Sequence, residues 1–431
     1  MPARTLCFCF VLLLTACASN PPRTLPEELT RTVPWGTLEA QDDLSAPEPI
    51  PEYAQIVINN IQSHRQQYPD QPIPMNLLLL SGGGVRGHYA TGILSGWSET
   101  GTRPEFDIVT GVSVGALIAT YAFLGSDYDQ QMIHDGYAAT ELLSSNKAQV
   151  SLFKTGSEYV GEGFMSLLEQ SLTPKVIAAV GEEYLKGRRL YVGTTNLDGA
   201  RFTVWDLGKI AISDRADKHQ LYRKVVLASA SVPMLFPPVM FEVNTPEGRF
   251  EQMHVDGGVT QNVFFADYDA IWHEVEQVIE LEHEDFIINN YVIHSGRLDD
   301  GPPAPPVTNS LFPIMARSVS TLLKANSASS IYKLWLTSMV QQANFHLASI
   351  PPDFELNSDL TQVDDEEMQR LFEQGYQRGK NGMAWLTQPP TRDQAELQRM
   401  LGSSTLKQNF ERWFYKQRAL QQSFTPESDI H

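Results

Sequence analysis

The 431-residue chain is predicted to fold as an α/β protein with three layers, in which helices cover both faces of a mostly parallel central sheet. Hydrophobic residues make up 42% of the chain and charged residues 19%, a composition that suits a large buried core. Residues 75–80, MNLLLL, form a short continuous apolar run, as expected of a strand buried on both faces. Such runs alternate with helix-like stretches, and this alternation favours parallel strands joined by crossover helices.

The remaining elements follow from the spacing of apolar residues. Residues 53–61 and 89–98 show helical spacing, and FDIVTGVSVGALIATYAFLG (residues 106–125) is typical of a strand, a tight turn and a helix. Further strands are expected at residues 190–195, 202–205, 224–228, 252–255 and 289–294. Residues 301–307, GPPAPPV, predict an irregular loop, after which helices dominate.

The region after this loop is expected to pack helices against the sheet. An apolar stripe at every fourth residue predicts one such helix, and its members are Ile331, Trp335, Met339, Ala343 and Leu347. The alternative for this helix is a lid or a membrane-facing element. The acidic run DDEE at residues 364–367 predicts a solvated helix start, and residues 386–431 are expected to form a C-terminal helical extension.

The N-terminus is predicted to be a lipoprotein signal peptide that covers residues 1–16. One positive charge, at Arg4, precedes an apolar run from Leu6 to Leu14 that is too short to span a bilayer. The run ends in LTAC, which resembles a bacterial lipobox, and in such signals the cysteine, here Cys17, becomes the lipidated first residue of the mature protein. The alternatives are an ordinary signal peptide or a buried apolar segment.

Cysteine usage favours the lipobox. The chain has three cysteines, Cys7, Cys9 and Cys17, and cleavage before the third would remove the other two. The residue after Cys17 is Ala18 and not an aspartate, which in lipoproteins of Gram-negative bacteria predicts the outer membrane. Residues 17–51 are rich in proline and acidic residues and are expected to form a flexible tether between the anchor and the folded domain.

The overall charge excludes one class of function. Acidic residues outnumber basic ones by 51 to 32, which gives a formal net charge of −19. Nucleic-acid-binding proteins need a basic footprint, so no nucleic-acid partner is expected. The acidity also gives no general attraction to anionic lipids, so contact with a membrane is expected to come through the lipid anchor.

A serine between two glycines is the first candidate for chemistry. The sequence GVSVG at residues 111–115 follows a predicted strand and precedes a predicted helix, which is the context of a nucleophile elbow. Gly111 and Gly115 are expected because the turn is too tight for side chains. The helix that begins beside Ser113 favours developing negative charge.

A glycine-rich loop, SGGGVRG at residues 81–87, follows the first predicted strand. Gly82, Gly84 and Gly87 match the dinucleotide-binding spacing, which also requires an acidic residue at the end of the next strand. Asp107 has the right separation but lies at the start of that strand, so no nucleotide cofactor is expected. The loop is expected instead to offer backbone N–H groups to the oxyanion of a tetrahedral intermediate. A turn that merely lets helix and strand pack is the structural alternative.

An aspartate before two glycines, in MHVDGGVTQN (residues 253–262), is the third motif. Asp-Gly is also a favoured hairpin turn, so this motif alone decides nothing. Taken together, the glycine loop, the serine elbow and the DGG motif resemble those of patatin-like phospholipases, in which they occur in this order. The segment ASASVPMLFPPV at residues 228–239 is similar to the family's proline-bearing segment between nucleophile and acid.

The resemblance is clear over about residues 75–300, and we expect an acyl hydrolase domain over residues 52–385. It implies a three-layer α/β/α patatin-like fold and hydrolysis of lipid esters, with no metal and no cofactor. One departure is visible: Val263 follows Asn262 at a position where the family often has a proline.

The resemblance also implies roles for individual residues. Ser113 would be the nucleophile and Asp256 the general base, without a histidine. The supporting positions are the oxyanion-hole glycines Gly82, Gly83 and Gly84, the loop residues Arg86 and Gly87, the elbow glycines Gly111 and Gly115, and the acid-motif glycines Gly257 and Gly258. A carboxylate that acts alone on a hydroxyl must be close to it and partly desolvated, so that its pKa rises toward the working pH.

The sequence is compatible with two alternatives. His294, at the end of the strand-like NNYVIH, follows Asp256, so a Ser113–Asp256–His294 triad of the α/β-hydrolase type is conceivable, and His88 lies next to the glycine loop. The second alternative is a catalytically inert lipoprotein of the same fold that binds lipid or a partner.

Overall fold

The computed structural model describes residues 50–144, 156–245, 248–265, 285–299, 306–356 and 365–390. The predicted signal peptide, Cys17 and most of the predicted tether lie outside the described residues, as does most of the predicted C-terminal extension. Helix α3 begins at Ile50 and so includes the last two residues of the predicted tether. None of the helices in the described ranges is long and apolar enough to cross a membrane.

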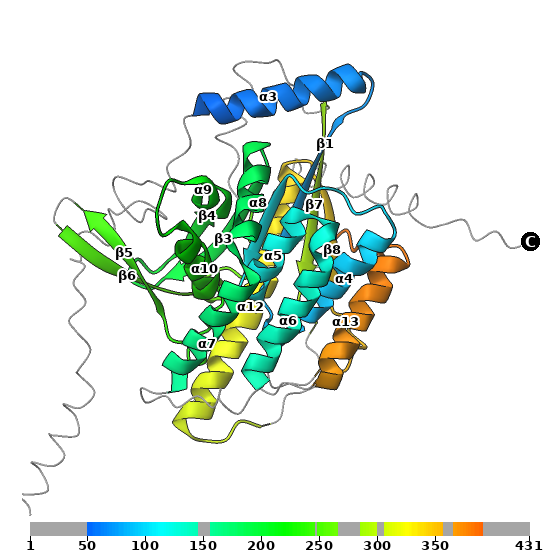
Figure 1. Cartoon of the computed structure of the whole chain (residues 1–431). Helices are drawn as coiled ribbons and strands as arrows, with labels where there is room; N and C mark the ends of the chain where they lie inside the picture. The colour runs from blue at the N-terminus through cyan, green and yellow to red at the C-terminus, as the bar shows by residue number, and fades with distance from the viewer. Residues whose placement is uncertain are drawn as a thin grey trace, which may run out of the picture.

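An eight-stranded sheet forms the middle layer of the molecule (Figure 1). Its strands run in the order β5-β6-β3-β2-β1-β7-β8, and β4 pairs separately with β3. The strands are β1 (Ile73–Leu80), β2 (Ile108–Val112), β3 (Arg189–Asn196), β4 (Arg201–Asp206), β5 (Val239–Thr245), β6 (Gly248–Asp256), β7 (Phe286–His294) and β8 (Asn344–Ser349). The five strands β3, β2, β1, β7 and β8 are parallel, whereas β4, β5 and β6 are antiparallel to their neighbours. The predicted α/β fold with a mostly parallel sheet is confirmed.

Helices cover both faces of this sheet (Figure 1). The α-helices are α3 (Ile50–Gln67), α4 (Gly87–Glu99), α5 (Val114–Leu124), α6 (Asp129–Ser144), α7 (Gly156–Ser171), α8 (Pro174–Leu185), α9 (Leu207–Ile212), α10 (Lys218–Ser229), α12 (Leu311–Val340) and α13 (Asp365–Lys380). Short 3-10 turns within the described ranges include η1 (Gly84–Arg86), η2 (Ser126–Tyr128) and η4 (Gly257–Val259).

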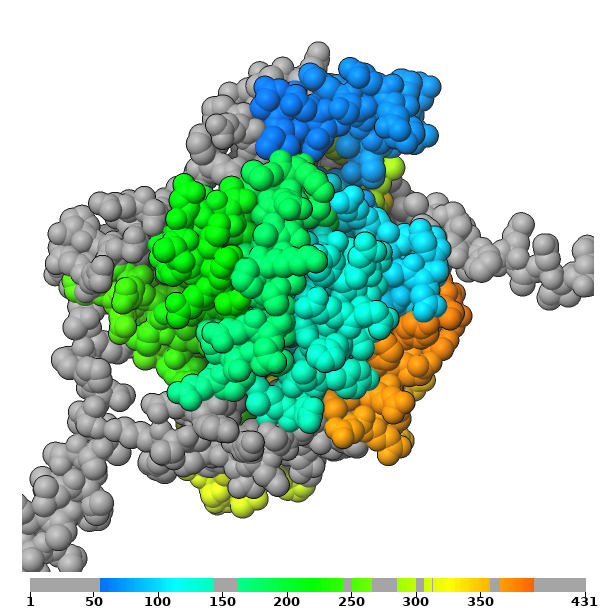
Figure 2. All heavy atoms as spheres, viewed as in Figure 1, coloured from blue at the N-terminus to red at the C-terminus, as the bar shows by residue number. Residues whose placement is uncertain are grey.

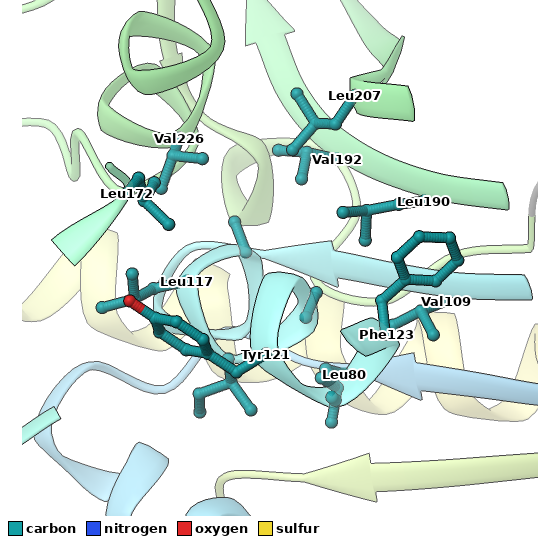
Figure 3. Close-up of a cluster of buried hydrophobic side chains, with 14 of the residues drawn as sticks. Leu80, Val109, Leu117, Tyr121, Phe123, Leu172, Leu190, Val192, Leu207 and Val226 are labelled. Carbon is teal, nitrogen blue, oxygen red and sulfur yellow. The ribbon is translucent and has the colours of Figure 1, made fainter. Parts of the chain in front are cut away.

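The leucines of β1 show why the fold has three layers. Side chains alternate across a strand, so Leu78 and Leu80 point to one face of the sheet and Leu77 and Leu79 to the other. The first pair joins the larger core with α4, α5 and α10, whose packing Figure 3 shows around Leu80 and Tyr121. The second pair packs on the other face against the C-terminal half of α12. All four leucines are buried, which explains the continuous apolar run in the sequence.

Helices α4 and α13 cross at glycines on both sides. A β-carbon at Gly96 would lie 2.1 Å from the backbone oxygen of Tyr376, and one at Gly379 would lie 2.4 Å from that of Ile93. Gly92 and Gly375 make equally close approaches to the opposite backbone. Because α4 begins directly after η1, this contact ties the C-terminal helix to the glycine loop.

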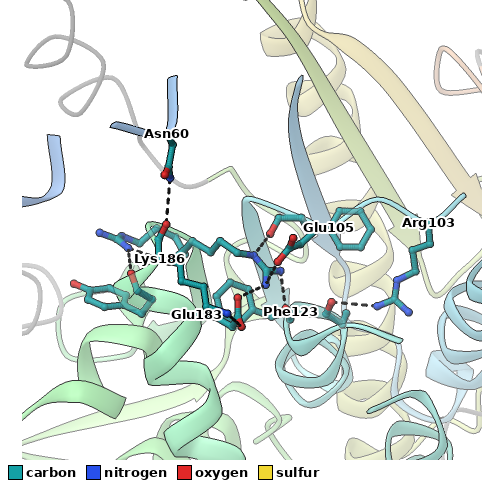
Figure 4. A network of polar contacts seen from close by, with 11 residues as sticks. Asn60, Arg103, Glu105, Phe123, Glu183 and Lys186 are labelled. Atoms are coloured by element: carbon teal, nitrogen blue, oxygen red, sulfur yellow. Dashed lines mark hydrogen bonds and ion pairs between the residues drawn. The ribbon is translucent and has the colours of Figure 1, made fainter. Parts of the chain in front are cut away.

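The amino ends of the central strands are held by a buried arginine (Figure 4). The Arg188 guanidinium donates to the backbone oxygens of Phe106 (2.8 Å) and Phe123 (2.6 Å) and to the carboxylate of Glu183 (2.8 Å). Asn60 of α3 donates to the Lys186 backbone oxygen at 3.2 Å, so the outer helix is joined to this network. This polar end lies opposite to the end at which β1 and β2 deliver the glycine loop and Ser113.

Most elements expected from the sequence are present. The helices at residues 53–61 and 89–98 correspond to α3 and α4, and the strands at 190–195, 202–205, 252–255 and 289–294 to β3, β4, β6 and β7. Helix α13 begins within the acidic run, at Asp365, although Glu367 in that run is buried rather than solvated.

Two expectations are wrong. Residues 224–228 belong to helix α10 and not to a strand, because Val225 and Val226 are fully buried against β3 within a twelve-residue helix. The stripe expected at every fourth residue ends with α12, since Ala343 follows that helix and Leu347 lies on β8. Their burial follows from the sheet and not from a helix face.

Candidate active site

The turn at Ser113 has the strand–turn–helix geometry that the sequence predicts. Strand β2 ends at Val112 and α5 begins at Val114, so Ser113 alone forms the turn. A β-carbon at Gly115 would lie 2.7 Å from the backbone oxygens of Leu80 and Ser81, and one at Gly111 would lie 2.4 Å from the Gly115 oxygen. Side chains at either glycine position would therefore force the strand and helix apart.

Ser113 itself has a strained backbone. Its φ is 57° and its ψ is −129°, a conformation that is rare for residues other than glycine. The residue caps the N-terminus of α5, where the helix dipole favours negative charge. Its N–H donates to the Ser229 hydroxyl at 2.9 Å, and this hydroxyl donates in turn to the Gly193 backbone oxygen at 2.7 Å.

Strand β3 brings the aspartate of the DGG motif to the serine. Gly193 pairs with Val112 of β2, while the next residue, Thr194, pairs with Asp256 at the end of β6. Ser113, after β2, and Asp256, at the end of β6, therefore lie on either side of β3 at the same level of the sheet. The Asp256 N–H donates to the Ser231 backbone oxygen at 2.9 Å, which holds the end of β6 against the segment that follows α10.

The Asp256 carboxylate is buried and only partly satisfied. Its Oδ1 accepts the Gly258 N–H at 2.7 Å, whereas Oδ2 has no partner of full hydrogen-bond geometry among the described residues. Burial raises the pKa of Asp256 from 3.8 to about 6, although the nearby Ser113 hydroxyl and the Gly258 N–H favour the charged form. A raised pKa and an open acceptor beside a serine hydroxyl suit a general base.

The two glycines after Asp256 allow close packing. A β-carbon at Gly257 would lie 2.5 Å from the Gly193 backbone oxygen, and one at Gly258 would lie 3.0 Å from Asp256 Oδ1. The turn is also held from outside, because Asn326 of α12 donates to the backbone oxygens of Gly258 (3.2 Å) and Val259 (2.7 Å). The DGG motif is therefore a 3-10 turn under α12 and not the tip of a hairpin.

The glycine loop lies against the serine. A β-carbon at Gly82 would come within 2.9 Å of the Ser113 β-carbon and 2.4 Å of Asn262 Oδ1, so only glycine fits there. Gly83 packs as closely on Ser295. Gly84, in contrast, has a φ of 56° and faces open space, since an added β-carbon would meet nothing within 4 Å. The open space above Gly84 is where a substrate can approach.

The N–H groups of the glycine loop are not equivalent, although the sequence predicts that Gly82, Gly83 and Gly84 all offer theirs to an oxyanion. Gly82 donates its N–H to the Asn262 backbone oxygen at 3.1 Å, so it is not available to an oxyanion. Within the described ranges, no hydrogen bond occupies the N–H groups of Gly83 and Gly84. Gly82 therefore serves close packing, and the two glycines that follow remain as candidate donors.

Arg86 and Gly87 complete the loop at the start of α4. Gly87 packs against Val114, the first residue of α5, and a β-carbon there would lie 2.6 Å from the valine side chain. Burial lowers the pKa of Arg86 below its ordinary value, and the buried carboxylate of Glu367 on α13 counters this effect. Arg86 thus faces a charge of opposite sign from the C-terminal helix, which favours a structural role for it.

The two candidate histidines lie with other partners. His294 Nδ1 is 3.0 Å from the Ser81 hydroxyl, and burial, aided by Arg86, lowers its pKa to about 3. His88 Nε2 is 3.0 Å from the Thr140 hydroxyl on α6, and burial lowers its pKa to about 4. Neither histidine has a hydrogen bond to Ser113 or Asp256 in the part of the chain that the structure describes. Both are neutral side chains at physiological pH.

The acid of the dinucleotide-binding pattern lies far from the glycine loop. Asp107, the acid of the dinucleotide pattern, precedes β2 and accepts the Asn76 N–H at 2.7 Å, at the opposite end of the strand from Ser113. Asp107 and the glycine loop therefore lie at opposite ends of the central strands. The described residues contain no group of three or more acidic, histidine or cysteine side chains arranged to hold a metal ion.

Two functional contacts had no clear signal in the sequence. Ser229 lies within the quoted segment ASASVPMLFPPV, but nothing in that pattern marks its hydroxyl as the partner of the Ser113 N–H. Asn262 holds the glycine loop through its backbone oxygen, and its side chain donates to the Ser327 hydroxyl of α12 at 2.5 Å. The departure from Asn-Pro after Asn262 leaves the placement of Ser113 and Asp256 intact.

Comparison with known families decides the class of this site. Residues 78–268 match the family model described as patatin-like phospholipase. This region is a patatin-like phospholipase domain. It contains β1, the glycine loop, the serine elbow and the DGG motif in one stretch. The family match thus concerns the region that carries all three motifs. A sequence search among curated proteins gives no match.

Solved structures are similar at low sequence identity. VipD from Legionella pneumophila is 12% identical, with a TM-score of 0.31 over 72% of this chain. The type III effector ExoU is 12% identical with a TM-score of 0.27, and ExoU in complex with SpcU from Pseudomonas aeruginosa is 13% identical with a TM-score of 0.28, each over 72% of this chain. This chain spans 66% of the length of VipD and 52% of that of ExoU.

Proposed function

We propose that the protein hydrolyses carboxylic esters of lipids with Ser113 as nucleophile and Asp256 as general base. The observation that carries this proposal is the buried Asp256 carboxylate, whose pKa is raised to about 6 and whose Oδ2 is left without a full hydrogen bond beside the Ser113 hydroxyl. An unpaired buried acceptor costs free energy, so its presence next to a strained serine favours a catalytic pair over a structural one.

The reaction follows from these positions. Ser113 Oγ attacks the ester carbonyl carbon while Asp256 accepts the hydroxyl proton, and the carbonyl oxygen becomes an oxyanion. The N–H groups of Gly83 and Gly84 donate to this oxyanion, and the N-terminus of α5 adds a favourable dipole. Collapse of the intermediate expels the alcohol, which takes the proton back from Asp256 and leaves Ser113 acylated.

Water completes the cycle. Asp256 accepts a proton from a water molecule, whose oxygen attacks the acyl carbon, and a second oxyanion forms at the same two N–H groups. Its collapse releases the fatty acid and returns the proton to Ser113 Oγ. These steps use only protein groups and water, and their physiological outcome would be lipid breakdown.

We also propose that lipidation of Cys17 anchors the protein at the bacterial outer membrane. The support is the sequence LTAC after a short apolar run, with Ala18 following the cysteine. Residues 17–51 would then act as a tether, so that a negatively charged domain is kept near its lipid substrate without a general attraction to the surface.

Release of fatty acid from mixed phospholipid micelles, measured with a chelator present, tests the proposed chemistry. The full chain would carry Cys17→Ser in every sample, so that lipidation contributes to none. We expect Ser113→Ala and Asp256→Asn each to lower the rate by about a thousandfold or more, as the loss of a catalytic group does elsewhere. Ser95→Ala on α4 and Asp107→Asn at the far end of β2 are matched controls, because Ser95 is buried and Asp107 half-buried, both away from the site.

The same assay separates the alternatives. His294→Asn keeps a polar group for Ser81 and is expected to retain most of the activity, whereas a loss of several thousandfold with the fold intact would favour the triad. If no variant and no wild-type sample releases fatty acid, fluorophosphonate labelling of Ser113 distinguishes an unsuitable substrate from an inert fold.

A further inference from the structure

The N-terminal half of α12 carries an apolar face that points to solvent. Leu311 is 76% exposed and Leu322 is 66% exposed, and Ile314 and Met315 are each 44% exposed. These four residues, called the α12 stripe below, recur at spacings of three, four and seven residues and so lie along one side of the helix. Figure 2 shows the beginning of α12, in yellow-green, at the lower surface of the molecule.

The C-terminal half of the same helix is an ordinary core element. Ile331, Leu334 and Trp335 are buried against the sheet face formed by Leu77 and Leu79. Packing therefore explains the apolar residues of one half of α12 and leaves those of the other half in water. A run of exposed leucine, isoleucine and methionine on one helix face is typical of a surface that meets another apolar phase.

The α12 stripe lies beside the candidate active site. The Leu323 side chain would be 3.3 Å from a β-carbon at Gly258, and Asn326 donates to the backbone oxygens of Gly258 and Val259. From Leu322 to Leu311 the helix continues for roughly 16 Å, given the rise of an α-helix. In Figure 1 this half of α12 extends past the end of the sheet at which the glycine loop lies.

The charge of α12 differs from that of the whole chain. Its thirty residues include Arg317, Lys324 and Lys333 and contain no aspartate or glutamate, although acidic residues outnumber basic ones by 51 to 32 overall. A helix that combines an exposed apolar stripe with basic residues and no acidic ones is complementary to an anionic lipid surface.

We propose that the N-terminal half of α12 docks on an anionic phospholipid bilayer and holds the mouth of the Ser113 site against it. The inference rests on the proposed lipid hydrolase function and adds the surface through which the lipid is reached. The stripe inserts into the interface between headgroups and acyl chains, and the excess of basic over acidic residues on α12 favours an anionic surface. The helix lies on the membrane, and Cys17 limits how far the domain can move from it.

Vesicle partitioning tests this surface. The full chain would carry Cys17→Ser, so that no anchor contributes, and Ser113→Ala, so that the vesicles are not consumed. Sedimentation with phosphatidylcholine vesicles, with and without phosphatidylglycerol, measures the partition coefficient. We expect the parent chain to bind anionic vesicles more strongly than neutral ones. The triple variant Leu311→Gln, Met315→Gln and Leu322→Gln should lower the partition coefficient on anionic vesicles by about tenfold or more, because each substitution removes an inserted apolar side chain.

A matched leucine provides the control. Leu185, at the end of α8, is 62% exposed but lies near the amino ends of the strands, so Leu185→Gln is expected to bind vesicles as the parent does. Equal binding by the triple variant and the parent would overturn the proposal. A dimer of the parent that the triple variant cannot form, without binding of either to vesicles, would also overturn it and assign the face to a second copy of the chain.

Activity on a soluble ester keeps this inference separate from the proposed function. With Ser113 present, the triple variant is expected to hydrolyse p-nitrophenyl butyrate at the parent's rate and to lose activity on vesicles. A parent that binds anionic vesicles through the stripe but cleaves neither substrate would support the surface and refute the hydrolase. A parent that cleaves both substrates and shows no dependence on the stripe would refute the surface alone.

Discussion

The backbone N–H of Ser113 donates to the hydroxyl of Ser229 at 2.9 Å, and this single bond joins the nucleophile elbow to the end of α10. The same hydroxyl donates to Gly193 O at 2.7 Å, and this oxygen also lies against Gly257 of the DGG motif. One buried hydroxyl thus joins the strained backbone of Ser113 to β3, the strand that pairs with the end of β6 at Asp256. Ser229 is a positioning residue, since no part of it touches Ser113 Oγ in these contacts.

Replacement of Ser229 by alanine is expected to slow catalysis. The variant leaves the buried Ser113 N–H without its partner, at about 1 to 3 kcal/mol, and removes the hydrogen bond to the Gly193 oxygen, so the strained φ of Ser113 loses its restraint. We expect kcat to fall by roughly ten- to a hundredfold with little change in KM. Ser231→Ala is the matched control, because Ser231 is equally buried but its hydroxyl donates only to the Leu227 oxygen. Equal loss of kcat in both variants would show that stability, and not positioning, is the cause.

The dependence of activity on pH should report the state of Asp256. The group must be ionised to accept the serine proton, and burial raises its pKa to about 6. We therefore expect kcat/KM on a soluble ester to be constant above about pH 7 and to fall tenfold per pH unit below about pH 6. A rate profile that stays flat to about pH 4, in a chain shown to be folded there, would contradict this assignment.

The same raised pKa implies that Asp256 destabilises the fold at neutral pH. Because its pKa is about 6 in the folded chain and 3.8 ordinarily, the folded state binds this proton more tightly than the unfolded state. Its contribution is most favourable below pH 3.8 and is lost as the pH rises through 6. Asp256→Asn should therefore raise the free energy of unfolding by about 3 kcal/mol at pH 8, and most of this gain should be lost near pH 4. Denaturant unfolding at pH 8 and pH 4 measures the free energy of unfolding of wild type and variant. A variant less stable than wild type at pH 8 would contradict the prediction.

The glycine contact between α4 and α13 should be sensitive to a single methyl group. A β-carbon at Gly96 would lie 2.1 Å from the Tyr376 backbone oxygen, so Gly96→Ala must separate the two helices and is expected to cost about 2 kcal/mol or more. Gly136, also inside a helix, has His88 as its nearest neighbour at 3.7 Å, so Gly136→Ala should be neutral or stabilising by up to about 1 kcal/mol. Thermal unfolding of both variants tests the difference. If Gly136→Ala loses as much stability as Gly96→Ala, the close contact between α4 and α13 is not the cause of the loss.

The sequence predicted those features that local chemistry dictates. Leu77–Leu80 is continuous and apolar because β1 is covered on both faces, and Ser113 lies between glycines because the turn after β2 leaves no room for side chains. The DGG motif was ambiguous by itself, since Asp-Gly suits a hairpin as well as the turn under α12. The order of the three motifs along the chain is what indicates a role for Asp256 in the site.

Features set by tertiary contacts could not be predicted in this way. The valines at 225 and 226 favour a strand locally, but α10 buries them against β3 as part of a helix. Gly82 resembles its two neighbours in sequence, and only the Asn262 backbone oxygen distinguishes its N–H from theirs. The partner of His294 is Ser81, a contact between residues 213 positions apart that no spacing rule shows.

The central claim, that Ser113 is a nucleophile activated by Asp256, is tested most directly by locating a covalent adduct. The folded chain would be treated with a fluorophosphonate, digested and analysed by mass spectrometry, with Asp256→Asn treated in parallel. We predict that Ser113 alone is modified and that Asp256→Asn slows its modification by about a hundredfold or more. Modification of another serine, or an equal rate at Ser113 in both chains, would contradict the claim.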